Sequence, residues 1–84
     1  MTPTEGGKPP TTEGANIATL TPRERQVIAL VGEGLRNKQI ARRLSLSETT
    51  VRRHLAAIFR KLEVAERLDL TLYAYRHGLA EIPS

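Results

Sequence analysis

The chain has 84 residues and a net charge of +4, and 39% of its residues are apolar, 26% charged and 4% aromatic. This length allows one small domain, which buries only about 60% of the surface that its unfolded chain exposes. Cysteine is absent and no apolar run approaches the roughly 20 residues that span a bilayer. Disulfide frameworks, thiolate metal sites, cysteine nucleophiles and membrane spans are therefore excluded, and we expect a cytoplasmic protein.

Residues 1–19 are predicted to be a disordered tail or an interdomain linker. Three prolines and three glycines in this segment oppose regular structure, and it offers little that is apolar enough to pack. We expect ordered structure to begin at Leu20, so the predicted domain covers residues 20–84.

A first helix is predicted to begin after Thr21. Pro22 suits the first helical position, and Glu24 stands three residues after the threonine cap, which together form a capping-box pattern. Gly34 can adopt the left-handed conformation that ends such a helix. The apolar positions that share one helical face are Val27, Ile28 and Val31.

Two further helices are predicted at about 38–44 and 48–62, with Asn37 and Ser47 as N-caps. Ala41, a tight turn at about residues 45–47 and β-branched Val51 follow the spacing of a helix-turn-helix, in which two steeply crossing helices leave room for little more than a methyl group. The core stripe expected on the second of these helices is Val51, Leu55, Ile58 and Leu62.

A fourth helix is predicted over about 67–77, ending at Gly78, and with no strand pattern the fold class is all-α. This helix is apolar on two sides. We expect Leu68, Thr71, Leu72 and Tyr75 to close the core. The second stripe, which indicates a homodimer contact, comprises Leu70, Tyr73, Ala74 and His77.

Positive charge is concentrated in the middle of the chain. Residues 36–61 hold eight basic side chains and one acid, a net charge of +7, which indicates a polyanion partner or else a solvated basic face. An α-helix fits the major groove of DNA, and arginine can pair two donors with guanine. The outward stripe of the predicted helix 48–62 carries Thr49, Arg53, Ala56 and Arg60, with Arg52 beside it.

Five short motifs in this order and spacing resemble the DNA-binding domain of the LuxR/FixJ/NarL family of bacterial transcription regulators. The motifs are LTPRE at 20–24, EGL at 33–35, NKQIA at 37–41, LSETTV at 46–51 and KL at 61–62. The resemblance implies a four-helix domain that binds double-stranded DNA, reads the major groove with its third helix and dimerises through its fourth. It also implies a response regulator in which a receiver domain precedes the linker.

The resemblance extends to individual positions. It implies base contacts at Thr49, Arg52, Arg53 and Ala56. Phosphate contacts are expected at Asn37, Lys38, Thr50 and Lys61, together with Arg60 on the same outer stripe. Members usually have glycine where Glu63 stands and often a long polar or basic residue where Ala56 stands, so the turn at residue 63 and one base contact are expected to differ.

Two alternatives remain open at this point. The fourth region of bacterial sigma factors has a similar helix-turn-helix and binds DNA while docked on RNA polymerase, which is a further candidate partner for this chain. A helical protein-interaction module is the second alternative. His54 and His77 fall on different predicted helices and there is no glycine-rich phosphate loop, so we expect no enzyme, cofactor or metal site.

Overall fold

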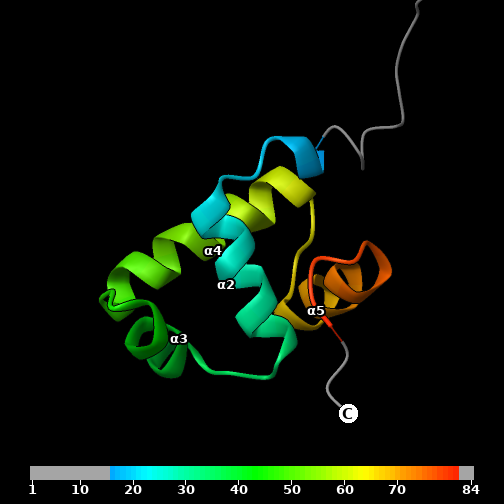
Figure 1. The fold of residues 1–84 in the computed structure, drawn as a ribbon. Coiled ribbons are helices and arrows are strands. Elements are labelled where there is room, and N and C mark those ends of the chain that lie inside the picture. Colours follow the sequence, from blue (N-terminus) through cyan, green and yellow to red (C-terminus); the bar gives the residue numbers. More distant parts are fainter. Residues whose placement is uncertain (1–15, 82–84) are drawn as a thin grey trace, which may run out of the picture.

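The computed structural model describes residues 16–81, and that range folds into helices without a strand. Figure 1 shows α2 (Pro22–Gly32), α3 (Asn37–Leu44), α4 (Glu48–Leu62) and α5 (Arg67–Arg76). Helix α2 lies across α4 and also packs against α5, while α3 packs on α4. The predicted all-α, four-helix fold is confirmed. Across this range no helix combines the length and the apolar character needed to cross a membrane.

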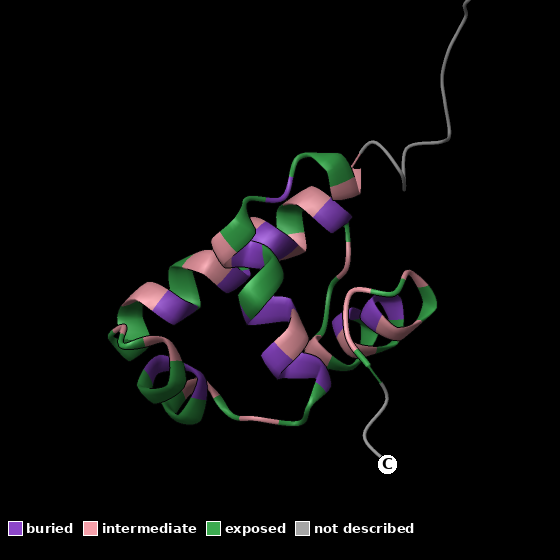
Figure 2. Cartoon of the chain, viewed as in Figure 1, coloured by how far each residue is buried: buried purple, intermediate pink, exposed green. Residues whose placement is uncertain are grey.

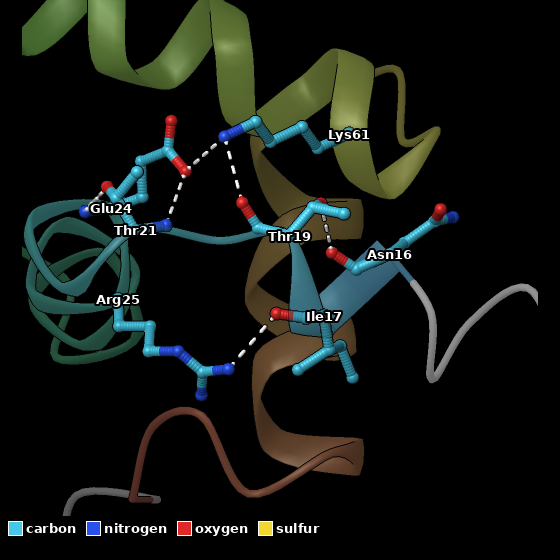
Figure 3. Close-up of polar contacts among 7 residues, drawn as sticks. All are labelled: Asn16, Ile17, Thr19, Thr21, Glu24, Arg25 and Lys61. Carbon is cyan, nitrogen blue, oxygen red and sulfur yellow. Dashed lines mark hydrogen bonds and ion pairs between the residues drawn. The ribbon is translucent and has the colours of Figure 1, made fainter.

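Three residues of the predicted tail are helical. Residues 16–18 form a helical turn, and Ile17 packs against the core. Arg25 Nη2 donates to the Ile17 carbonyl at 3.0 Å, which ties the turn to α2 (Figure 3). Residues 16–18 therefore differ from the predicted tail, while the rest of that tail, residues 1–15, lies outside the described residues.

The core forms between the helices, on the faces that point inward in Figure 2. The buried apolar side chains are Leu20, Val27, Ile28, Leu30, Val31, Ile40, Ala41, Val51, Leu55, Ile58, Leu62, Leu70, Tyr73 and Ala74. Burying one such Val, Leu or Ile side chain stabilises the fold by roughly 1.5–3 kcal/mol. The core stripes predicted for α2 and α4 are confirmed.

Helix α2 starts with the predicted capping box. The backbone N–H of Glu24 donates to Thr21 Oγ1 at 3.1 Å, and the backbone N–H of Thr21 donates to Glu24 Oε1 at 2.9 Å. These two bonds satisfy backbone donors that have no partner inside the helix. They also place the Glu24 carboxylate in a buried position.

All four helices, α2 to α5, end with the same backbone motif. A residue in the left-handed region closes each helix, at Gly34, Ser45, Glu63 and Gly78. The next residue donates its backbone N–H to the carbonyl five positions earlier, at 2.8–3.2 Å, and its side chain packs on the core. Those following residues are Leu35, Leu46, Val64 and Leu79. This is the Schellman motif with its accompanying apolar contact, and glycine in the sequence indicated the helix end at Gly34 and at Gly78 but not at Ser45 or Glu63.

The helix-turn-helix has the predicted packing at its crossing point. Ala41 on α3 is 5% exposed and Val51 on α4 is completely buried, and these two helices pack on each other. Ser47 caps α4, because its Oγ accepts from the backbone N–H of Thr50 at 3.0 Å. At α3, however, the N-cap is Arg36 and not Asn37. The Asn37 side chain accepts instead from Arg67 Nη1 at 2.8 Å, which removes it from the capping role.

The face that α5 turns to the core is the opposite of the one predicted. Leu70, Tyr73 and Ala74 are buried, so their predicted role in a dimer contact is wrong. His77 is half-buried and its ring lies 4.3 Å from that of Tyr73. Leu68 is 65% exposed and Leu72 is 49% exposed.

One residue of the predicted core stripe of α5, Tyr75, does contact α2. Both apolar stripes repeat at helical spacing, so local periodicity does not choose between them. The Tyr75 hydroxyl donates to the carbonyl of Gly32 at the end of α2. A Cβ at Gly32 would collide with the side chain of Ala80, so the glycine allows the segment after α5 to approach α2 closely.

Glu63 provides a test of backbone strain. Glu63 has φ 57°, and for a residue with a Cβ this left-handed conformation is roughly 1 kcal/mol less favourable than the right-handed one. Glycine adopts this region freely. We expect Glu63→Gly to raise the free energy of unfolding by about 0.5–1 kcal/mol in chemical denaturation. Glu66→Gly is the control, since Glu66 is exposed at φ −133° and loses the same charge. An equal gain in both variants would assign the effect to charge and not to strain.

Candidate nucleic-acid interface

The outer face of α4 gathers five of the predicted contact residues. Thr49, Arg52, Arg53, Ala56 and Arg60 are all exposed. They lie away from the stripe that α4 buries in the core. The packing that anchors α4 therefore leaves its arginine-bearing side free to meet a ligand.

Hydrogen bonds within the first turns of α4 orient two of the polar side chains. Ser47 Oγ donates to Thr50 Oγ1 at 3.0 Å, so the Thr50 hydroxyl keeps its own proton for an outside acceptor such as a phosphate. Arg52 Nη2 donates to Thr49 Oγ1 at 3.4 Å, which aligns the arginine along the helix. The N-terminal end of α4 thus presents donors in fixed positions.

A shallow hollow of about 340 Å³ opens beside this face, between α4 and the start of α5. Because Ala56 ends at Cβ, its position adds no bulk on the α4 side of the hollow. The hollow is lined by Asn37, Arg52, Leu55, Ala56, Phe59, Ala65, Glu66 and Arg67. An apolar group of the size of a thymine methyl fits next to Ala56, and polar groups surround it.

The start of α3 brings further predicted residues to the same region. Asn37 is half-buried at the edge of the hollow, and Lys38 is exposed on the first turn of α3. Asn37 Oδ1 already accepts from Arg67, so its Nδ2 remains available as a donor. Arg36, Arg42 and Arg43 are also exposed and extend the positive charge along α3.

Lys61 makes a contact that the sequence did not predict. Figure 3 shows its Nζ donating to Glu24 Oε1 at 2.8 Å and to the Thr19 carbonyl at 3.1 Å. The ammonium thereby joins the end of α4 to the start of α2 and compensates a carboxylate whose side chain is only 6% exposed. Lys61 thus has a structural role inside the protein, and its expected phosphate contact stays a prediction.

The same contact controls the ionisation of Glu24. Burial favours the neutral acid and by itself would raise the pKa of Glu24, but the hydrogen bonds from Lys61 and from the Thr21 backbone outweigh it. The positive charges of Lys61 and His54 act in the same direction, so the pKa of Glu24 lies below its ordinary value of 4.5. The carboxylate is ionised at neutral pH although it is buried.

Arg67 is a site residue that the sequence did not reveal. Its Nη1 donates to Asn37 Oδ1 at 2.8 Å and its Nη2 donates to the Leu35 carbonyl at 2.7 Å. Burial lowers the pKa of Arg67 from its ordinary value. Its partners lie 30 and 32 residues earlier in the chain, so no local pattern indicated the contact.

The structure offers no grouping of residues suited to metal chemistry. Within residues 16–81, no three His, Cys, Asp or Glu side chains come together as metal ligands. His54 is half-buried on α4. The chemistry of the α4 face is thus that of hydrogen-bond donors and positive charge, which suits recognition of a polyanion.

Comparison with known proteins supports the same interpretation. Residues 18–74 match the family model described as "Bacterial regulatory proteins, luxR family". The chain is 38% identical over 64 residues to the nitrate/nitrite response regulator protein NarL of Escherichia coli (strain K12), which covers 76% of this chain and 30% of that protein. It is 43% identical over 64 residues to the transcriptional regulatory protein LnrK of Bacillus subtilis (strain 168), covering 76% of this chain and 29% of that protein.

The matched relatives are much longer than this chain. A protein of Mycobacterium bovis that carries an HTH-type transcriptional regulator name is 50% identical over 60 residues, which is 71% of this chain and 7% of that protein. The similarity is thus confined to one part of each relative.

The Glu24–Lys61 contact predicts how stability changes in acid. A lowered folded-state pKa stabilises the fold above the unfolded value, and this contribution disappears as pH falls through the folded value, below about 4.5. We expect Glu24→Gln to reduce the free energy of unfolding by about 1–3 kcal/mol at pH 7, because it leaves Lys61 without its carboxylate partner. The difference from wild type should shrink below pH 4.5, as measured by denaturation from pH 7 to pH 3.

Glu33→Gln is the matched control, since Glu33 is exposed at the end of the same helix. We expect it to change stability by less than about 0.5 kcal/mol throughout this pH range. A pH-independent loss in Glu24→Gln would contradict the ionised pair and indicate a packing defect.

Proposed function

The chain belongs to the luxR family of bacterial regulatory proteins, and from this premise we propose that it reads the major groove of DNA with α4 to regulate transcription. One observation supports the proposal above all others: the arginine-bearing face of α4 is exposed while the opposite face is locked in the core. A helix held in this way can enter a groove without disturbing the fold.

In this proposal the first turns of α4 face the base edges. Arg52 and Arg53 each have the paired donors that match guanine O6 and N7. Thr49 lies one turn before them and offers a hydroxyl, whereas the methyl group of Ala56 suits contact with a thymine methyl. Many members are expected to have a long polar or basic residue at this position, so alanine should change the base that is preferred there.

The phosphates would be bound by groups on either side of this face. Lys38 and Asn37 lie at the start of α3, and Thr50 and Arg60 lie on α4. Contacts to phosphates set the register of the protein on the duplex but carry little sequence information. Because cations are released from DNA when such contacts form, affinity should fall steeply with salt.

Arg53→Ala tests the proposed readout. A duplex selected from a random pool supplies the target, and affinity for one half-site is measured from 50 to 200 mM salt. We expect the variant to lose about 1–3 kcal/mol of specific binding, because a bidentate contact to a guanine is removed.

Arg76→Ala is the control for Arg53→Ala, since Arg76 is an exposed arginine on α5 and not on α4. Equal losses in the two variants, or a failure of the wild type to enrich any sequence, would contradict the proposal. Enrichment of a promoter element that is bound only with RNA polymerase present would favour the sigma-like alternative.

We also propose that the chain pairs through α5, on a face other than the predicted one. Leu68 and Leu72 stand four residues apart on one side of α5, and both are exposed. A two-fold contact through these side chains would remove apolar surface from water. It would also present two α4 helices to successive major grooves, which suits a two-fold binding site.

Leu72→Glu tests this pairing. A buried carboxylate pair across a two-fold contact is unfavourable, so we expect the variant to sediment as a monomer and to lose cooperative binding to a two-fold site while keeping its half-site affinity. Gln26→Glu is the control, because it places the same side chain at an exposed position on α2. Unchanged cooperativity in Leu72→Glu would contradict pairing through this face.

The wider role is proposed from the relatives. NarL and Rre1 of Synechocystis are named response regulators, and this chain matches 30% and 26% of their lengths. We propose that a receiver domain controls this domain through the segment before α2, and that the bound protein acts on RNA polymerase. The turn at residues 16–18, bonded to α2 through Arg25, is where such a segment meets the domain.

A further inference from the structure

The start of α5 is joined to the start of α3 through one side chain. Arg67 is the first residue of α5, and its guanidinium crosses to the segment that enters α3. There it donates to two oxygens, Asn37 Oδ1 at 2.8 Å and the Leu35 carbonyl at 2.7 Å. Two bonds from one planar group fix its orientation, which a single bond would not do.

We propose that Arg67 is a positioning residue for DNA binding, which holds the Asn37 carboxamide so that its Nδ2 donates to the DNA backbone. This inference rests on the proposed function. Neither the family resemblance nor the predicted contact residues include Arg67.

The chemistry of the two side chains selects this orientation. An arginine is only a donor, so it can bond the oxygen of the Asn37 carboxamide but not its nitrogen. The bond to Arg67 therefore turns the Asn37 oxygen toward α5 and leaves the nitrogen for another acceptor. Without Arg67 the carboxamide could rotate and present its oxygen to a phosphate, which would repel it.

Arg67 acts through Asn37 and does not itself contact the phosphate. Its side chain is half-buried, and both of its terminal nitrogens already donate within the protein. Asn37 and Arg67 both line the hollow beside Arg52 and Ala56, next to the face that would enter the groove, but only Asn37 keeps a nitrogen, Nδ2, that donates to no group among residues 16–81. The orienting side chain and the contacting side chain are therefore distinct.

A double-mutant cycle tests the proposal. Arg67→Lys keeps the charge but cannot form the planar two-bond bridge, and Asn37→Ala removes the group that the bridge orients. We expect Arg67→Lys to weaken binding to the selected half-site about 3–10-fold, as for the loss of one hydrogen bond to a charged group. In the Asn37→Ala background the same change should alter affinity less than about 2-fold. Arg76→Lys, on the same helix, should have no effect in either background.

The salt dependence separates positioning from direct contact. If Arg67 bound a phosphate itself, Arg67→Gln would reduce the slope of log affinity against log salt by about 0.9. A positioning role leaves the slope unchanged while affinity falls. A reduced slope would overturn the proposal, as would equal losses in both Asn37 backgrounds, since the latter would mean that Arg67 only stabilises the fold.

A measurement on the wild-type protein covers the case in which a variant does not fold. In ¹⁵N NMR spectra, the Asn37 side-chain amide signals should shift and gain protection from exchange when the half-site duplex is added. The Arg67 guanidinium signals should change little. The opposite pattern would overturn the proposal. If the wild type binds no duplex specifically, the proposed function itself fails, and this result is distinct from any outcome of the mutant cycle.

Discussion

The close approach of α3 and α4 is the constraint on which the interface depends. Ala41 is nearly inaccessible where the two helices meet, and the fully buried Val51 closes the crossing from the α4 side. Helices that approach this closely need a short connection, and Ser45 supplies it by adopting the left-handed conformation at φ 58°. Because α4 is held by its apolar stripe, its opposite stripe is left to solvent, and that stripe bears the arginines.

The structure also shows which basic side chains are exposed and which one is paired within the protein. One of the eight basic side chains in residues 36–61, Lys61, is used internally to compensate Glu24. The other seven are exposed, and they lie on α3, on α4 and just before α3. Exposed like charges at this density repel one another, and a polyanion relieves that repulsion. A carboxylate at the start of α2 therefore pairs with one of the basic residues, although α2 itself bears none of the predicted contacts.

What the sequence could predict was local. The capping box at Thr21, the cap at Ser47 and the core stripes of α2 and α4 depend on residues within a few positions of each other, and all are observed. The rotation of α5 was not predictable, because both of its stripes have helical spacing and only its packing against α2, which is distant in the sequence, selects the buried one. The roles of Asn37 and Lys61 likewise depend on partners at least 30 residues away.

The first turn of α5 combines an internal contact with an exposed apolar side chain. Arg67 points inward and bonds the segment that enters α3, while the next residue, Leu68, is exposed on the outer side. A second chain pressing on Leu68 would act on the same turn that holds Asn37. If Arg67 and Asn37 act as proposed, a contact that steadies this turn would favour the arrangement in which Asn37 donates outward, and by linkage DNA bound at Asn37 would favour that contact in return. Pairing through α5 and binding through α3 would then be coupled through one arginine, without any movement of α4.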